Sequence, residues 1–152
     1  MVTVMASGTF DLLHMGHIYY LNEAKKLGDK LIVVVACDET VRKMKHEPVT
    51  SEHLRLGLIK ELKIVDDAFL GNKGDMYTIV EEIQPDIIAL GFDQIHDAEN
   101  IEKKLKERKI SAEIVRLQKF EDMNDLDGTR RIIAKIIAAY EFQKEMEAIE
   151  KT

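Results

Sequence analysis

The stretch GTFDLLHMGH, residues 8–17, decides how the rest of this sequence is interpreted. It follows an apolar run at residues 2–6, which is typical of a buried strand, and it leads into a helical pattern at residues 16–27. A turn between a strand and a helix often needs a glycine, but it does not need two histidines. His14 and His17 at this junction therefore ask for a functional reason.

Apolar strands alternate with helical patterns along the chain. We expect strands at residues 2–6, 31–36, 68–70, 86–90 and 112–117, and helices at residues 16–27, 51–62, 76–83 and 99–108. Gly28 is typical of a helix stop and Ser51 of a helix start. Strands that alternate with helices need crossover connections, so the pattern predicts an α/β fold with a parallel sheet covered on both faces.

Length and composition limit the class of protein. The chain has 152 residues, 45% of them apolar and 33% charged, which suits one globular domain over residues 1–152. A net charge of -6 does not suggest a nucleic-acid partner, and no apolar run reaches membrane-spanning length. The lone Cys37, which we interpret as a small buried side chain, suits a reducing compartment and a cytoplasmic location.

A long C-terminal helix is expected at residues 129–150. Its first half carries an apolar face formed by Ile132, Ile133, Ile136, Ile137 and Tyr140, and its second half is mostly charged. We expect the first half to pack on the sheet, whereas the second half either frames a dimer contact or frays. A symmetric homodimer is the default expectation for a small enzyme.

The opening stretch combines several features that suit a bound triphosphate. Ligands of open parallel sheets collect beyond the carboxyl ends of the strands, where this stretch lies. It offers flexible glycines, outward backbone N–H groups, two histidines on one face of a helix start and a positive helix end, supplied by Gly8, Thr9, Phe10, His14, Gly16 and His17. A histidine in a helix is more often a packing or surface residue, and a zinc site ranks low because no HExxH motif or cysteine pair accompanies the two.

Basic residues downstream are candidates for phosphate contacts. In the segment VRKMKHEP, residues 41–48, Lys43 and Lys45 point the same way if the chain is extended there. Arg55 lies on the following helix, with Lys63 two turns further along. The alternative is a solvated charged loop and helix surface.

Two later segments also reach the expected site edge. Gly91 and Asp93, in LGFDQ, directly follow an apolar strand, so Asp93 is placed to accept hydrogen bonds from a ribose or base, or else to cap a helix. The segment DLDGTRRI, residues 125–132, offers Gly128 and Thr129 as donors to phosphate, with Arg130 or Arg131 adding charge. There the alternative is a simple helix N-cap.

These motifs together resemble those of the small cytidylyltransferase-like nucleotidyltransferases. GTFDLLHMGH carries the HxGH signature of that family, and the lysine pair, the helical arginine, VDDAFLG at residues 65–71 and LGFDQ follow in the family's order. The resemblance implies a Rossmann-like, doubly wound parallel sheet of about five strands. It also implies transfer of a nucleotidyl group from a nucleoside triphosphate to a phosphorylated acceptor, with release of pyrophosphate.

The resemblance assigns roles residue by residue. It implies that His14 and His17 stabilise the transition state, that the N–H groups of Thr9 and Phe10 hold the α-phosphate, and that the following residues contact phosphates, acceptor or nucleoside: Gly16, Lys43, Lys45, Arg55, Gly91, Asp93 and Thr129. Lys63 stands where some relatives have arginine. Of the family's second signature, an Ile-Ser-Ser/Thr-Thr type run, only Thr129 is matched here.

The acceptor stays open at this level. SGTFDLLHMGH, LGDKLIVVVACDETV and PDIIALGFDQ are most similar to the archaeal FAD synthases, which adenylate FMN with ATP, although those usually carry cysteines near the final signature and this chain has none after Cys37. Glycerol-3-phosphate cytidylyltransferases share the opening, and heptose-type sugar-phosphate adenylyltransferases share the domain. A nucleotide-binding regulatory module without turnover is the non-enzymatic alternative.

The expected mechanism is a direct in-line attack of an acceptor phosphate oxygen on the α-phosphorus of ATP. We expect Mg²⁺ to bind with the nucleotide, held mainly by its phosphates, with Asp11 nearby and no direct protein ligand assigned.

Overall fold

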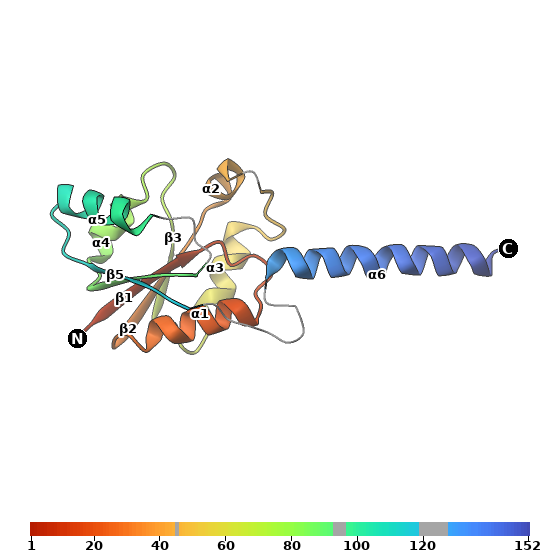
Figure 1. Cartoon of the computed structure of the whole chain (residues 1–152), viewed down its shortest axis with the longest axis horizontal. Helices are drawn as coiled ribbons and strands as arrows, with labels where there is room; N and C mark the ends of the chain where they lie inside the picture. The colour runs from red at the N-terminus through yellow and green to blue at the C-terminus, as the bar shows by residue number, and fades with distance from the viewer. Residues whose placement is uncertain (45, 93–96, 119–127) are drawn as a thin grey trace.

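A computed structural model describes residues 1–44, 46–92, 97–118 and 128–152. Its centre is a five-stranded sheet in the order β3-β2-β1-β4-β5, and every neighbouring pair is parallel (Figure 1). The strands are β1 (Thr3–Gly8), β2 (Lys30–Val35), β3 (Asp67–Leu70), β4 (Ile87–Leu90) and β5 (Glu113–Arg116). All five expected strands are confirmed, with small shifts at their ends.

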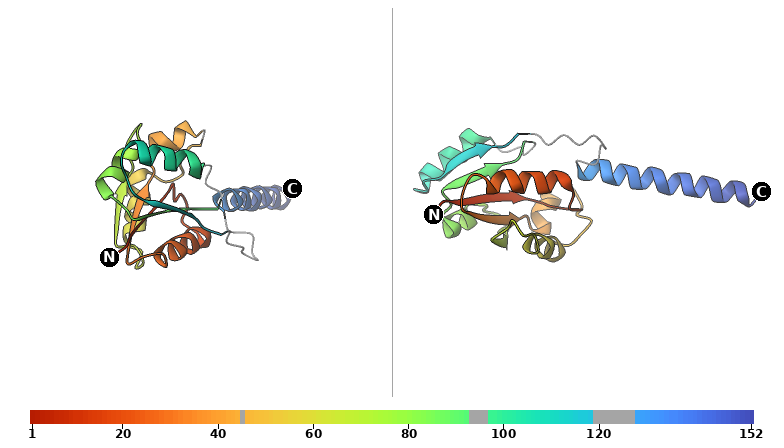
Figure 2. Two further views of the ribbon diagram at one scale, coloured as in Figure 1. Left: turned by 60° about the vertical axis from the view of Figure 1, so that its left-hand side comes forward. Right: turned by 90° about the horizontal axis from the view of Figure 1, so that it is seen from below.

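The described residues form six helices. They are α1 (Met15–Lys25), α2 (Asp38–Lys43), α3 (Glu52–Lys60), α4 (Tyr77–Ile83), α5 (Ala98–Glu107) and α6 (Thr129–Glu150). Helices α1 and α3 pack on one face, where Leu21, Ala24 and Ile59 meet Val33 and other strand residues. Helices α4 and α5 cover the other face in a second apolar cluster. Two covered faces confirm the predicted Rossmann-like α/β class (Figure 2).

Strands β1 and β4 are neighbours in the sheet, and the connections on their two sides cross opposite faces of it. Connections from β1 to β3 run over the α1 and α3 face, whereas α4 and α5 carry the chain over the opposite face. The order therefore reverses beside β1, which makes the carboxyl ends of β1 and β4 the topological switch point. Residues 8–17 leave the sheet at this point.

One short helix was not expected from the sequence. Residues 38–43 form α2, whose acidic first turn (Asp38 and Glu39) and basic last turn (Arg42 and Lys43) both favour the helix dipole. The extended backbone that would align Lys43 with Lys45 is therefore absent at Lys43, because that residue ends a helix.

Helix α6 has the expected bounds but not the expected packing. It extends away from the rest of the molecule as a straight rod, and none of its residues is buried (Figures 1 and 2). Ile132 and Ile133 are half-buried, while Ile136, Ile137 and Tyr140 are exposed. The expectation that its first half packs on the sheet is wrong: α1 and α3 cover one face of the sheet, and α4 and α5 cover the other. Within the described residues, no helix combines the length and apolar character needed to cross a membrane.

Gly28 has a packing role rather than the helix-stop role that its position suggested. Helix α1 ends at Lys25, and the capping residue Lys26 keeps right-handed backbone angles. A Cβ atom at Gly28 would lie 2.7 Å from Cγ2 of Val4 and 2.8 Å from the carbonyl oxygen of Val2. Only glycine lets the turn after α1 approach β1 so closely.

Two glycine substitutions should therefore shift stability in opposite directions. Gly28→Ala is expected to lower the free energy of unfolding by about 1–3 kcal/mol, because the new methyl group meets backbone. Gly57→Ala, in the exposed part of α3 with nothing within 4 Å, is expected to raise it by about 0.5–1 kcal/mol through helix propensity. Urea unfolding of both variants measures this, and equal effects would contradict the assigned packing role.

Candidate active site

The two histidines of residues 8–17 form one stacked unit at the start of α1. Their ring centroids lie 3.7 Å apart with an interplanar angle of 26°. His14 is the N-cap of the helix, so both imidazoles stand at its positive end. The prediction that the two histidines lie on one face at the start of the helix is confirmed.

Backbone hydrogen bonds select the tautomer of both rings. Nδ1 of His14 accepts from the N–H of Gly16 (3.1 Å), and Nδ1 of His17 accepts from the N–H of His14 (3.2 Å). An accepting Nδ1 carries no proton, so in the neutral ring the proton lies on Nε2. Burial, and then the neighbouring His14, lower the pKa of His17 to about 3. His17 is thus a neutral Nε2–H donor at physiological pH.

The loop between β1 and α1 is held in an unusual backbone conformation. Phe10 and Leu12 both have positive φ angles, 54° and 49°, which residues other than glycine rarely adopt. The buried ring of Phe10 stabilises this loop by lying edge-on to His17 and stacking on Tyr20. Gly8 makes room for that ring, since a Cβ there would lie 3.0 Å from its Cζ atom.

Tyr20 was not singled out from the sequence, yet it supports the site at the switch point. Its hydroxyl donates to the carbonyl of Ala89 on β4 (2.7 Å) and accepts from the N–H of Ser7 on β1 (3.3 Å). The Tyr20 side chain therefore connects β1 to β4, the two strands at the switch point, by hydrogen bonds. Its ring also stacks on the ring of Phe10.

Arg55 is fully buried, and its guanidinium joins three segments of the site edge. Nε donates to the carbonyl of Thr50 (3.0 Å), and Nη1 donates to the carbonyls of Thr9 (2.8 Å) and Ala36 (2.7 Å). Nη2 forms an ion pair with Asp38 (2.6 Å). Burial is the largest single effect on Asp38 and raises its pKa, but the hydrogen bond from Arg55, a further hydrogen bond and the charges of Arg55 and Arg42 together lower the pKa of the carboxyl group below its ordinary value. These contacts suit a positioning residue better than the direct substrate contact implied by the resemblance.

Asp11 organises the segment that precedes α3. Its Oδ2 accepts from the N–H of Val49 (2.7 Å), and its Oδ1 accepts from the N–H (3.0 Å) and the hydroxyl (2.7 Å) of Thr50. Burial raises the pKa of Asp11, but these hydrogen bonds, first that of the Thr50 hydroxyl, hold it below its ordinary value of 3.8. The carboxylate is thus engaged on both oxygens by its own chain.

The start of α6 reaches the same loop. The hydroxyl of Thr129 donates to the carbonyl of Asp11 (2.9 Å), and Nη2 of Arg130 lies 3.2 Å from Nε2 of His46. The N-cap is Gly128, with no side-chain capping bond, so Thr129 is a bridge and not a cap. Two helix N-termini, those of α1 and α6, therefore flank Asp11 and supply positive potential, to which the guanidinium of Arg130 adds.

The remaining sequence candidates have four different outcomes. Gly91 is buried at the end of β4, where its carbonyl accepts from Arg116 (3.0 Å). Lys43 is exposed and pairs with Glu39 on its own helix (3.4 Å). Lys45 and Asp93 lie outside the described residues. Lys63 is exposed in the turn after α3, at the amino edge of the sheet and away from the histidines.

The donor set here does not fit a metal ion held by protein ligands. Among the residues described, no three His, Cys, Asp or Glu side chains are grouped to hold one. Asp11, which was expected near a metal, has both carboxylate oxygens in hydrogen bonds to Val49 and Thr50. The described residues therefore offer no grouped set of protein ligands for a magnesium ion at this site.

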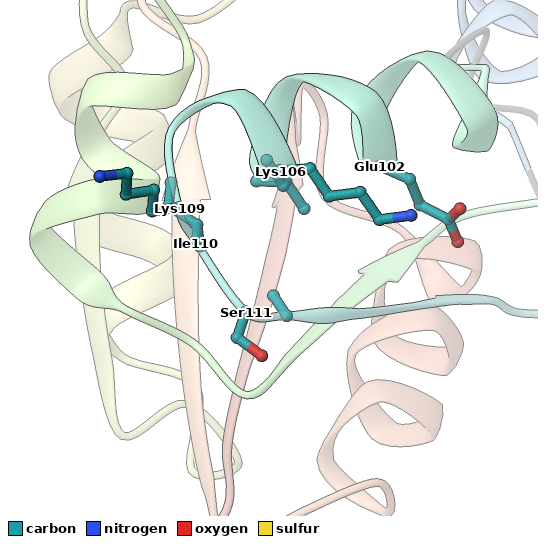
Figure 3. Close-up of a pocket in the computed structure, with 7 residues that line it drawn as sticks. Glu102, Lys106, Lys109, Ile110 and Ser111 are labelled. Carbon is teal, nitrogen blue, oxygen red and sulfur yellow. The ribbon is translucent and has the colours of Figure 1, made fainter.

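A shallow cavity of about 510 Å³ lies elsewhere, between the end of α5 and the start of β5 (Figure 3). Glu102, Lys106, Lys109, Ile110 and Ser111 line it together with Leu105 and Ala112. It opens at the amino edge of the sheet, opposite to the histidines. Lys106 and Lys109 point in opposite directions, so they do not converge on a common anion (Figure 3).

Comparisons with known proteins agree with this geometry. The model of a family described as cytidylyltransferase-like matches residues 5–138. A protein of Aciduliprofundum boonei named FAD synthase is 53% identical over 90% of this chain and 91% of its own length. Another FAD synthase, from Thermoplasma volcanium, is 48% identical over 90% and 97% of the two chains. A crystal structure of the lipopolysaccharide core biosynthesis protein from T. volcanium is 51% identical, with a TM-score of 0.79 over 80% of this chain and 99% of that one.

The pKa of His17 can be tested in the protein without ligand. In the folded chain its imidazole should stay neutral down to about pH 4, whereas in the urea-unfolded chain it should titrate near 6.5. Since the unfolded state then binds more protons, His17 contributes stability above pH 6.5 that is lost as the pH falls toward 3. An NMR titration of the ring carbons measures both values, and a folded-state midpoint near 6.5 would rule out the assigned neutral donor.

The role of Arg55 can be separated from that of an ordinary arginine. Arg55→Lys should lower the free energy of unfolding by about 2–3 kcal/mol, because one ammonium group cannot replace hydrogen bonds to three carbonyls and a carboxylate. Arg42→Lys, at an exposed ion pair with Glu47, is the matched control and should leave stability unchanged. Urea unfolding followed by circular dichroism measures both, and a silent Arg55→Lys would contradict the positioning role.

Proposed function

Because the chain belongs to the cytidylyltransferase-like family, we propose that it transfers the AMP unit of ATP to FMN, forming FAD and releasing pyrophosphate. The observation that carries this proposal is the pair of relatives named FAD synthase, 53% and 48% identical over about nine-tenths of each chain. The nucleotidyltransferase class also suits the site, which presents helix ends and imidazole N–H donors where a triphosphate can bind.

The proposed reaction is a single in-line displacement. A phosphate oxygen of FMN attacks the α-phosphorus of ATP, the new P–O bond forms, and the bond between the α-phosphorus and its bridging oxygen breaks. The electron pair of that bond leaves with pyrophosphate. No covalent intermediate with the protein is needed, because positioning and charge stabilisation supply the rate.

In this proposal, the chain contributes donors and fixed geometry. His14 and His17 donate from Nε2 to phosphate oxygens as negative charge accumulates on them. The N–H groups of Thr9 and Phe10 hold the α-phosphate, and Arg55 fixes that segment through the carbonyl of Thr9. The rim of the site consists of the start of α1, the end of β4 and the start of α6, where Gly16, Gly91 and Thr129 lie. The proposal also includes contacts of Lys43, Lys45 and Asp93 with phosphate and nucleoside.

Three further properties belong to the proposal. Mg²⁺ accompanies ATP, held by the nucleotide, because Asp11 is engaged by Val49 and Thr50. The lone Cys37, buried and unpaired with any other cysteine, suits the reducing cytoplasm. The working unit is a homodimer, supported by the exposed apolar side chains of α6.

The activity and the histidine roles can be tested in one assay. Mixing the chain with ATP, FMN and Mg²⁺ should release pyrophosphate and form FAD in equal amounts. His14→Ala and His17→Ala should each lower kcat by about 10²–10³-fold, because each removes a donor to developing charge. His53→Ala, on the exposed side of α3, is the matched control and should keep full activity.

Other outcomes of this assay separate the alternatives. Tight ATP binding without pyrophosphate release would show a regulatory module in place of an enzyme. Replacing FMN by a sugar phosphate or by glycerol-3-phosphate, with ATP or CTP, tests the second candidate, which the T. volcanium lipopolysaccharide protein favours by its 51% identity. Faster release with one of these acceptors than with FMN would contradict our assignment of the acceptor.

A further inference from the structure

Helix α6 carries a second apolar strip that the site does not use. Positions 132, 135, 139, 142, 146 and 149 follow one another at alternating spacings of three and four residues. That spacing keeps them on one side of a helix, as in the seam of a coiled coil. The seam, as we call these six positions, consists of Ile132, Lys135, Ala139, Phe142, Met146 and Ile149.

The distal part of the seam faces solvent in the single chain. Phe142 and Ile149 are about two-thirds exposed (64% and 65%), and Met146 is 43% exposed. Helices in proteins are stabilised mainly by the packing of an apolar face, and a row of large exposed apolar side chains indicates a missing partner. Something that covers the seam would stabilise both the helix and these side chains.

The charges of α6 indicate what that partner is. Its first half, residues 129–139, contains three basic side chains and no acidic one: Arg130, Arg131 and Lys135. Its second half, residues 140–150, contains four glutamates and one lysine, a net charge of -3. The two halves are opposite and equal in charge, so an antiparallel copy of the same helix is electrostatically complementary along its whole length.

The seam is complementary to itself in size when the copies run antiparallel. A two-fold axis between positions 139 and 142 places Ala139 opposite the partner's Phe142, so a small side chain faces a large one. The same axis places Ile132 opposite the partner's Ile149 and Lys135 opposite the partner's Met146. The stem of Lys135 then covers the methionine while its ammonium group reaches the partner's acidic half.

We propose that α6 is the dimerisation element of this protein and that two copies pair antiparallel through the seam. The pairing also has a consequence for the site. Because Thr129 and Arg130 contact the loop at Asp11 and His46, the carboxyl end of each α6 reaches the active-site rim of the other copy. This inference does not depend on which acceptor the enzyme uses.

Sedimentation velocity of the whole chain tests the interface. At tens of micromolar, the chain should sediment with twice its 17.4 kDa mass. Phe142→Glu should raise the dissociation constant of the dimer by roughly 100-fold, because a charge replaces the central apolar contact. Ile137→Glu is the matched control: it makes the same type of change at a 52% exposed apolar residue on the opposite side of α6, and should leave the dimer intact. Circular dichroism checks that both variants fold.

Cysteine cross-linking tests the direction of pairing. Lys135→Cys mixed with Met146→Cys should form an oxidised heterodimer, because antiparallel helices bring these positions together, and neither variant alone should cross-link. The natural Cys37 is 2% exposed and does not compete. A wild-type monomer, an intact Phe142→Glu dimer, or cross-linking within either single variant would overturn the proposal. Unchanged FAD formation by a monomeric Phe142→Glu variant would leave the proposed enzymatic function standing apart from it.

Discussion

The buried guanidinium of Arg55 is the contact on which the shape of the active site depends. A parallel sheet leaves carbonyl groups without ladder partners where each strand ends, and here the carbonyls of Thr9, Ala36 and Thr50 converge on one buried point. Only arginine offers enough donors in a rigid planar group to satisfy three carbonyls and the carboxylate of Asp38 at once. The segments after β1, after β2 and before α3 are therefore fixed relative to one another by one side chain.

A second chain of contacts transmits this rigidity to the histidines. The hydroxyl of Tyr20 joins β1 to β4 by hydrogen bonds. The ring of Tyr20 stacks on that of Phe10, and the ring of Phe10 packs edge-on against His17. The positive φ angles of Phe10 and Leu12 would be unfavourable in an isolated peptide. They persist because packing and hydrogen bonds from two neighbouring segments determine them, which is the usual way in which a folded chain stabilises a strained functional loop.

The sequence predicted the fold and the histidine pair well because both follow from local patterns. Strand and helix periods identified every strand of the described residues, and HxGH spacing placed His14 and His17 on one face. It predicted Asp11 and Arg55 less well because their partners are distant along the chain: Asp11 contacts Thr50, and Arg55 contacts Thr9. A signal was nevertheless present, since Arg55 lies one helical turn before the buried Ile59 and therefore faces the core. The isolation of α6 had no such signal, because its apolar face resembles one that packs on a sheet.

The neutral state of His17 bears on how such a site can favour a transition state over a substrate. The two imidazoles are stacked at 3.7 Å, and the pKa of His17 is lowered to about 3, so the ligand-free pair does not carry two positive charges at physiological pH. Under our proposal, the Nε2–H groups of the two rings hold the ground state only moderately, and their hydrogen bonds strengthen as charge builds up on the reacting phosphate oxygens. The helix ends supply the standing positive potential without proton uptake. Under our proposal, binding energy is therefore expressed mainly in the transition state, which is what raises kcat rather than affinity alone.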